Sequence, residues 1–279
     1  MKYAVYYSQL SNYHTSKPDE IIIKYTKNEG KIRDYCAEMP DSRIIIRVDS
    51  PDVNFIKLKA EIAECKKDNV NNFAITVPSY MFNIDADFFD FMETLGIEFF
   101  FIDLVDSWTQ LYSVLQCGVS DIYVTNDLAF EIDKVAATAH SAGAKVRLVP
   151  NMVQRDAFNQ IPILKSFFIR PNDIELYEDY VDIMELAVLT PYNIDQALNI
   201  YRKGKWFGDL RELILNFNDS LDCRYVVDQF GKTRLSCGHR CLKGKQCHMC
   251  DTIQSLSHSL EKVNLAVLPK KEKKNEEIS

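Results

Sequence analysis

Short apolar runs alternate along the chain with segments whose apolar residues recur every three or four positions. The runs 43–48 and 98–103 are nearly continuous in large apolar residues, which is typical of strands that are buried on both faces. Helical spacing is found between such runs, at 52–67, 107–116 and 127–141. This alternation predicts βα units arranged around a parallel sheet.

Eight strands are predicted from the apolar runs. They are expected at 20–25, 43–49, 72–77, 97–103, 121–125, 145–150, 163–170 and 182–188. Eight βα units favour a closed (β/α)8 barrel of the TIM type over an open doubly wound sheet. The run 2–7 is an alternative first strand, in which case one of the later strands is assigned wrongly. Asp52 and Asn126 are the expected helix N-caps, and Gly143 suits a helix C-terminus.

Polar residues that close the predicted strands are the first candidates for chemistry, because barrel enzymes place their active sites at the carboxyl ends of the strands. These residues are Asp49, Asp103, Thr125, Asn126, Asn151, Arg170 and Glu185. Asp49 and Asn126 also suit a capping role. Arg170, which Pro171 follows, would present a cation suited to a carboxylate or a phosphate. The competing interpretation of Arg170 is an ion pair with Asp173 or Glu175.

The cysteines are unevenly distributed, and five of the eight lie between 223 and 250. Two close pairs, with three and two residues between the partners, could share one metal centre: Cys237, Cys241, Cys247 and Cys250. Thiolates favour zinc or an iron-sulfur cluster over calcium or magnesium. Zinc would stabilise a tail that has little apolar content of its own, and Cys223 could serve as a further ligand. Cys65 and Cys117 are interpreted as buried apolar residues.

The cysteine distribution also predicts the domain organisation. We expect the barrel over 1–217, a Cys-rich metal-binding extension with a short helix over 218–268, and a disordered charged tail over 269–279.

Composition narrows the classes of function. Of the 279 residues, 47% are hydrophobic and 26% are charged, as in ordinary globular proteins. The net charge of -7 does not favour a polyanion, so no duplex DNA partner is expected, although basic clusters at 201–206 and 240–245 could hold RNA. The sequence has neither a membrane-spanning run nor a signal peptide pattern, so we expect a cytoplasmic protein with no membrane partner. Its oligomeric state is left open.

The stretch 168–178, with Val181 and Asp182 after it, resembles the "IRPEDL..YE...D" segment of the collagenase-like peptidase U32 family. The preceding stretches 118–125 and 149–154 look like successive barrel strands of that family. The terminal cysteines resemble the closing cysteine block of one branch, so the resemblance covers about residues 96–250.

This resemblance implies a barrel that, in several family members, holds a cysteine-ligated four-iron four-sulfur cluster. Some members resemble oxygen-independent hydroxylases of ubiquinone precursors, and others hydroxylate pyrimidines in RNA with prephenate. The resemblance thus implies an iron-sulfur enzyme acting on a small molecule or an RNA base, and one branch would add Cys36 as a ligand. We expect Arg170, Asp173 and Glu185 as catalytic residues. We expect Asp49, Asp103, Asn126 and Asn151 as binding residues.

The sequence also departs from the family pattern. No cysteine follows Asn151 closely, and Glu185 and Leu189 stand where relatives often carry basic residues. These differences motivate a second hypothesis, in which the barrel is not catalytic and a structural zinc knuckle supports a binding or scaffold module. A third hypothesis, true peptidase activity, rests on the family name.

Overall fold

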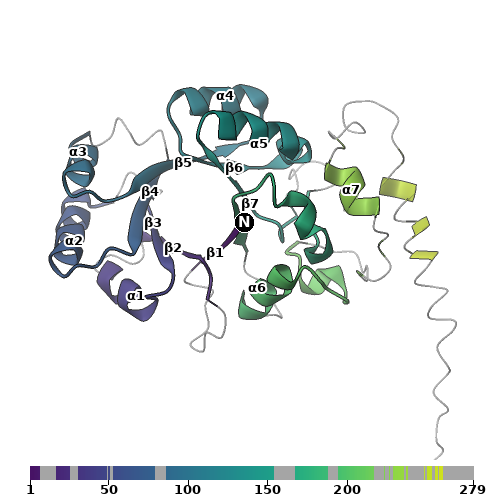
Figure 1. Ribbon diagram of the computed structural model, residues 1–279, viewed down its shortest axis with the longest axis horizontal. Helices are drawn as coiled ribbons and strands as arrows, with labels where there is room; N and C mark the ends of the chain where they lie inside the picture. The colour runs from purple at the N-terminus through teal and green to yellow at the C-terminus, as the bar shows by residue number, and fades with distance from the viewer. Residues whose placement is uncertain are drawn as a thin grey trace, which may run out of the picture.

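The structure, a computed structural model, describes residues 1–6, 17–25, 31–48, 50, 53–78, 86–153, 167–187, 194–216, 223, 226, 229–235, 237, 248, 250–252, 255–256 and 258–259. Eight parallel strands form a closed barrel, in which each strand pairs with the next along the chain and the last pairs with the first. The strands are β1 (Lys2–Tyr6), β2 (Glu20–Lys24), β3 (Arg43–Arg47), β4 (Phe73–Val77), β5 (Phe99–Val105), β6 (Asp121–Val124), β7 (Lys145–Leu148) and β8 (Ile183–Leu186). The protein therefore has the predicted (β/α)8 TIM-type barrel fold (Figure 1).

Helices surround the strands, as Figure 1 shows. The α-helices are α1 (Ile32–Glu38), α2 (Phe55–Lys67), α3 (Ala86–Thr94), α4 (Trp108–Gln116), α5 (Ile132–Ser141), α6 (Ile194–Lys203) and α7 (Gln229–Leu235). Short 3-10 helices are η4 (Asn126–Glu131), η6 (Pro171–Tyr177) and η7 (Leu210–Glu212). None of the helices in the described ranges is long and apolar enough to cross a membrane.

One predicted strand is wrong, and the alternative first strand is correct. β1 is the strand Lys2–Tyr6, whereas the described part of the predicted strand 163–170, residues 167–170, lies outside the barrel sheet. Phe167 and Phe168 are nevertheless fully buried, and Phe168 packs against Phe230. An apolar run buried by packing has the same composition as a buried strand, so periodicity does not distinguish the two.

The helix ends also differ in part from the prediction. Asn54 caps α2, since its side chain accepts a hydrogen bond from the Lys57 amide at 3.0 Å, while the expected cap Asp52 lies outside the described residues. Asn126 is the first residue of η4 rather than a cap. Gly143 follows α5 with a φ of +78°, as expected for a helix C-terminus.

Alternate residues along each strand point either to the helices or into the barrel. The outward residues form the main hydrophobic core with the helices. The inward apolar residues form a separate cluster: Ala4, Ile22, Ile45, Ala74, Phe100, Ile102, Tyr123 and Ile183. Charged residues stand on the same inward positions above and below this cluster, and they make the barrel interior the place to look for chemistry.

The start of the expected Cys-rich extension packs on the barrel. α7 packs against η6 and η4, and its Phe230 is 1% exposed. Beyond α7, the structure describes only short pieces of 218–268, and 269–279 lies outside the described residues. The domain boundaries therefore stay a prediction.

Candidate active site at the carboxyl end of the barrel

A balanced group of charges fills the amino half of the barrel interior. Arg147, 0% exposed, lies 2.7 Å from Asp121 and 2.9 Å from Glu20. Arg43 lies 3.3 Å from Glu20 and also pairs with Glu98 at the surface. Burial raises the pKa of the Asp121 carboxyl, and Arg147 opposes this rise. Because each cation here has a carboxylate partner, we interpret this lower layer as structural.

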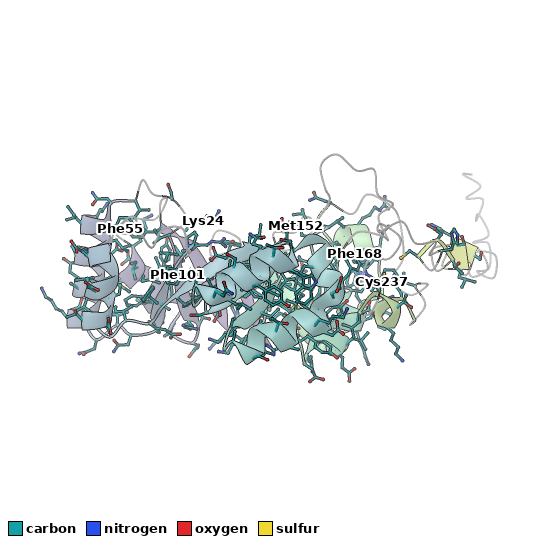
Figure 2. All side chains as sticks on the ribbon, turned by 90° about the horizontal axis from the view of Figure 1, so that it is seen from above. Lys24, Phe55, Phe101, Met152, Phe168 and Cys237 are labelled. Carbon is teal, nitrogen blue, oxygen red and sulfur yellow. The ribbon has the colours of Figure 1, made fainter. Side chains whose placement is uncertain are left out.

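A second polar group lies nearer the carboxyl ends of the strands. This upper layer consists of Tyr6, Lys24, Arg47, Thr76 and Glu185. Arg47 donates a hydrogen bond to the Tyr6 hydroxyl at 3.0 Å, and Lys24 lies over the Tyr6 ring at 5.9 Å. Figure 2 places Lys24 and Met152 along the same edge of the barrel, the edge where β2 and β7 end. In barrel enzymes the reaction takes place at this edge.

Glu185 is the buried acid of the upper layer, with 4% exposure. Burial, with a smaller contribution from Glu20, raises its pKa from 4.5 to about 7, while Arg47, a hydrogen bond from Tyr6 and Lys24 oppose this rise. Near neutral pH the carboxyl group therefore populates both its protonated and its charged form. A group with such a pKa can donate and accept protons efficiently, so Glu185 is a candidate general acid–base residue.

Three polar atoms around this site lack a hydrogen-bond partner among the described residues. They are Oε2 of Glu185, the hydroxyl of Thr76 and the hydroxyl of Tyr123. All three side chains are more than nine-tenths buried. An unsatisfied buried polar atom costs about 1–3 kcal/mol, so these atoms are the ones expected to hydrogen-bond a bound molecule.

Arg170 and Asp173 lie outside the barrel interior and bind each other. The guanidinium donates two hydrogen bonds to the Asp173 carboxylate, at 2.6 and 2.7 Å, and a third to the Val226 carbonyl at 3.1 Å. It also stacks on the Phe230 ring at 5.2 Å. Both side chains are buried. The ion-pair interpretation of Arg170 is therefore confirmed, and the pair joins η6 to the segment around α7.

The expected binding residues are placed in different ways. The Asn151 side chain exchanges two hydrogen bonds with the Ala187 backbone, at 2.8 and 3.2 Å, and so holds the end of β8. Asp103 is paired in register with the outward-facing Ile122, so it faces the helices, and β5 continues to Val105 beyond it. The Asn126 side chain and all of Asp49 lie outside the described residues.

Sequence analysis missed the cations of the upper layer. Lys24 and Arg47 close two strands of the same form, Glu-Ile-Ile-Ile-Lys and Arg-Ile-Ile-Ile-Arg. The signal was present, because charges four positions apart in a strand point to the same face. Their inward direction could not be assigned, since the pattern does not say which face is turned into the barrel.

Only part of the expected metal centre is described. Cys237 and Cys250 are half-buried, and Cys241 and Cys247 lie outside the described residues. Cys250 packs against an apolar cluster that contains Cys223, whose thiol donates to the Asn172 side chain at 3.1 Å. The described residues contain no group of three or more His, Cys, Asp or Glu side chains placed to hold a metal. A thiolate centre fits the chemistry of these donors, and the ligand set stays a prediction.

Of the three cysteines outside the C-terminal group, Cys36 and Cys65 are buried in the core and Cys117 is not. Cys65 is buried, as expected, and burial raises its pKa to about 11. Burial likewise raises the pKa of the Cys36 thiol to about 12, which disfavours the thiolate that a metal ligand requires. Cys117, which was expected to be buried, is exposed at the C-cap of α4.

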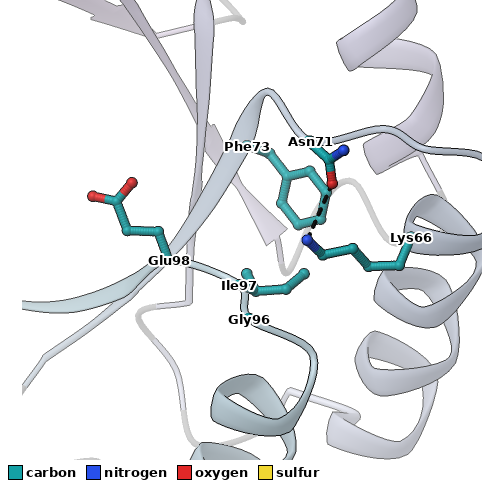
Figure 3. A pocket seen from close by; sticks show the side chains of 6 residues that line it. All are labelled: Lys66, Asn71, Phe73, Gly96, Ile97 and Glu98. Atoms are coloured by element: carbon teal, nitrogen blue, oxygen red, sulfur yellow. Dashed lines mark hydrogen bonds between the residues drawn. The ribbon is translucent and has the colours of Figure 1, made fainter.

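A surface hollow of about 360 Å³ lies at the opposite end of the barrel (Figure 3). It is lined by Lys66, Asn71, Phe73, Gly96, Ile97 and Glu98. The Lys66 ammonium donates to the Asn71 side chain at 3.1 Å. Because the hollow adjoins the amino ends of β4 and β5, we do not assign the reaction to it.

Neither a protein-family model nor a curated protein matches this chain in sequence. The resemblance to the U32 family is therefore carried by its sequence motifs alone.

Proposed function

We propose that this protein is an enzyme that acts on a small molecule at the carboxyl end of its barrel, with Glu185 as general acid–base group. The observation that carries the proposal is the buried Glu185 carboxyl, whose pKa is raised to about 7 and whose Oε2 has no partner in the described part of the chain. Both oxygens of the structural Asp173 carboxylate, by contrast, accept hydrogen bonds from Arg170.

The neighbours of Glu185 suit proton transfer. Arg47 and Lys24 favour its charged form, and burial favours its neutral form, so neither form dominates near neutral pH. A proton taken from the substrate would reside on Oε2 and could return to another substrate atom. This chemistry fits isomerisation, elimination or hydration of a small molecule.

The proton affinity of Glu185 provides the first test. In protein labelled with 13C at glutamate side chains, we expect one carboxyl resonance to titrate near pH 7 and to disappear in Glu185→Gln. The folded state holds this proton up to about pH 7, whereas the unfolded state loses it near pH 4.5. The free energy of unfolding of the wild-type protein should therefore decrease as the pH rises from 4.5 to about 7. Relative to Glu185→Gln, the fall should be about 3 kcal/mol. A midpoint at the ordinary value would contradict the proposal.

Turnover can be tested before the substrate is known. The wild-type protein would be incubated with a cell metabolite extract in heavy water, and deuterium incorporation or product formation would be followed by mass spectrometry. Glu185→Gln should abolish any change that the wild-type protein produces. Glu93→Gln, at an exposed position on α3, is the matched control and should retain it.

We also propose that the cysteine cluster binds a metal centre, with a four-iron four-sulfur cluster as the more specific form. The clustered thiols and the U32 resemblance support this form, which would extend the activity to oxygen-independent hydroxylation of a small molecule or an RNA base. When bound, such a cluster would supply one-electron chemistry. Cys237 and Cys250, with Cys241 and Cys247, would hold it.

Metal content provides the second test. Anaerobically purified protein is expected to contain iron and sulfide and to absorb broadly near about 400 nm. Cys237→Ser and Cys250→Ser should lose this absorption, whereas Cys117→Ser, at an exposed thiol, should retain it. Colourless protein with one zinc per chain would instead support a structural knuckle. Zinc together with an ordinary Glu185 titration would favour the binding or scaffold module.

A further inference from the structure

Three side chains of the upper layer stand in a row across neighbouring strands. Lys24 on β2 is in register with Arg47 on β3, and Arg47 is in register with Thr76 on β4. In-register residues on parallel strands share a face and are separated by about 4.8 Å. The row therefore places two cations and one hydroxyl next to one another at the carboxyl end of the barrel.

A bound anion would stabilise such an arrangement. Like charges on directly neighbouring strands destabilise a sheet. Thr76, which is 1% exposed, has no hydrogen-bond partner for its hydroxyl within the described ranges. One bound anion would reduce the repulsion between the cations and accept a hydrogen bond from the hydroxyl.

The two arginines of β3 show the difference between the ends of the barrel. Arg43, at the amino end, pairs with the carboxylates of Glu20 and Glu98. Arg47, at the carboxyl end, donates instead to the neutral Tyr6 hydroxyl and lies over the Tyr123 ring at 5.4 Å. Within the part of the chain that the structure describes, Arg47 has no ion pair. Its guanidinium retains donors that suit an external carboxylate or phosphate.

The two layers also differ in charge. The lower layer has two arginines against two carboxylates, Glu20 and Asp121. Among the residues that the structure describes in the upper layer, Lys24 and Arg47 are the cations and Glu185 is the carboxyl group. Two cations therefore stand near one titratable acid, in a chain whose net charge is -7. A local positive potential in a concave site attracts small anions.

From this row we infer that Lys24, Arg47 and Thr76 bind an oxyanion group of the substrate, a carboxylate or a phosphate, beside Glu185. The inference rests on the proposed function, because it assigns the substrate class of the same site. The substrate is then a small anionic molecule, held by its charged group at β2, β3 and β4 while Glu185 on β8 exchanges a proton with it.

The test uses inorganic phosphate and malonate as probes, with binding measured by calorimetry and thermal shift at constant pH and ionic strength. We expect saturable binding of at least one probe. Lys24→Met and Arg47→Met should each weaken it about 10-fold or more, and Thr76→Val about 5-fold. Lys145→Met is the matched control, because Lys145 begins β7 at the amino end of the barrel and is exposed. It should bind as the wild-type protein does.

Lys24 is exposed, so Lys24→Met should fold even if Arg47→Met does not. Tighter binding of malonate would identify a carboxylate substrate, and tighter binding of phosphate a phosphorylated one. The inference is overturned if neither probe saturates, or if Lys24→Met and Lys145→Met bind equally well.

Glu185→Gln separates this inference from the proposed function. It should retain probe binding, since it leaves both cations in place. Probe binding without a Glu185 titration near pH 7 would contradict only the acid–base role. A Glu185 titration near pH 7 without probe binding would contradict only the oxyanion site.

Discussion

Replacing Arg147 with methionine is expected to lower the free energy of unfolding by about 3–5 kcal/mol. Arg147 is fully buried between Glu20 and Asp121, and methionine fills a similar volume without the charge. The substitution leaves two carboxyl groups inside the barrel without their shared cation. Urea unfolding, followed by tryptophan fluorescence, measures the loss.

Two controls make this prediction specific. Arg33→Met removes an ion pair between Arg33 and Asp68, two exposed surface residues. This substitution should change the free energy of unfolding by less than about 1 kcal/mol. Adding Glu20→Gln and Asp121→Asn to Arg147→Met should restore much of the loss, since neither carboxylate is then buried without Arg147 and Arg43 keeps its ion pair with Glu98. The single variant should also recover at acid pH, where the carboxylates take up protons. Equal effects of Arg147→Met and Arg33→Met would show that the lower layer does not stabilise the barrel.

Arg170→Met is expected to have a similarly large effect, about 3–5 kcal/mol, because it leaves the buried Asp173 carboxylate without its bidentate partner. It also removes the hydrogen bond to the Val226 carbonyl and the contact with Phe230. Amide hydrogen exchange should therefore increase most in η6 and α7, with smaller changes in β2 and β3.

The same variant distinguishes a structural from a catalytic role of Arg170. Under conditions in which Arg170→Met is folded, Glu185 should still titrate near pH 7 and the anion probes should still bind. Adding Asp173→Asn should recover part of the stability. If Arg170→Met were fully stable but no longer bound the probes, the catalytic assignment made from the sequence would be supported instead.

Much of the barrel could be predicted from local pattern, because a strand that is buried on both faces is nearly continuous in apolar residues. The runs that became β2, β3 and β6 were found with nearly correct bounds. The prediction of a strand at 163–170 failed for a physical reason: Phe167 packs against Phe130 of η4 and Phe168 against Phe230 of α7, and neither lies in the sheet. An apolar run predicts that a segment is buried, but it does not predict which element covers the segment.

The candidate site was predictable only in part. Glu185 was found because it is an acid near the end of a buried strand, a position that can be predicted from the sequence alone. Arg170 met the same criterion, yet it binds Asp173 three residues away. Whether a charged side chain binds a ligand or a neighbour depends on distances that spacing does not give.

The sequence by itself determined the alternation of strands and helices, the barrel class and the clustering of the thiols, because each of these follows from local periodicity or spacing. Only the tertiary structure decided that Lys24, Arg47 and Thr76 stand side by side and that Arg147 lies between two acids. Lys24, Arg47 and Thr76 come from three successive strands, whereas Arg147 on β7 lies far along the chain from Glu20 on β2. Their proximity follows from strand register and from closure of the barrel between β8 and β1, which are properties of the folded chain as a whole.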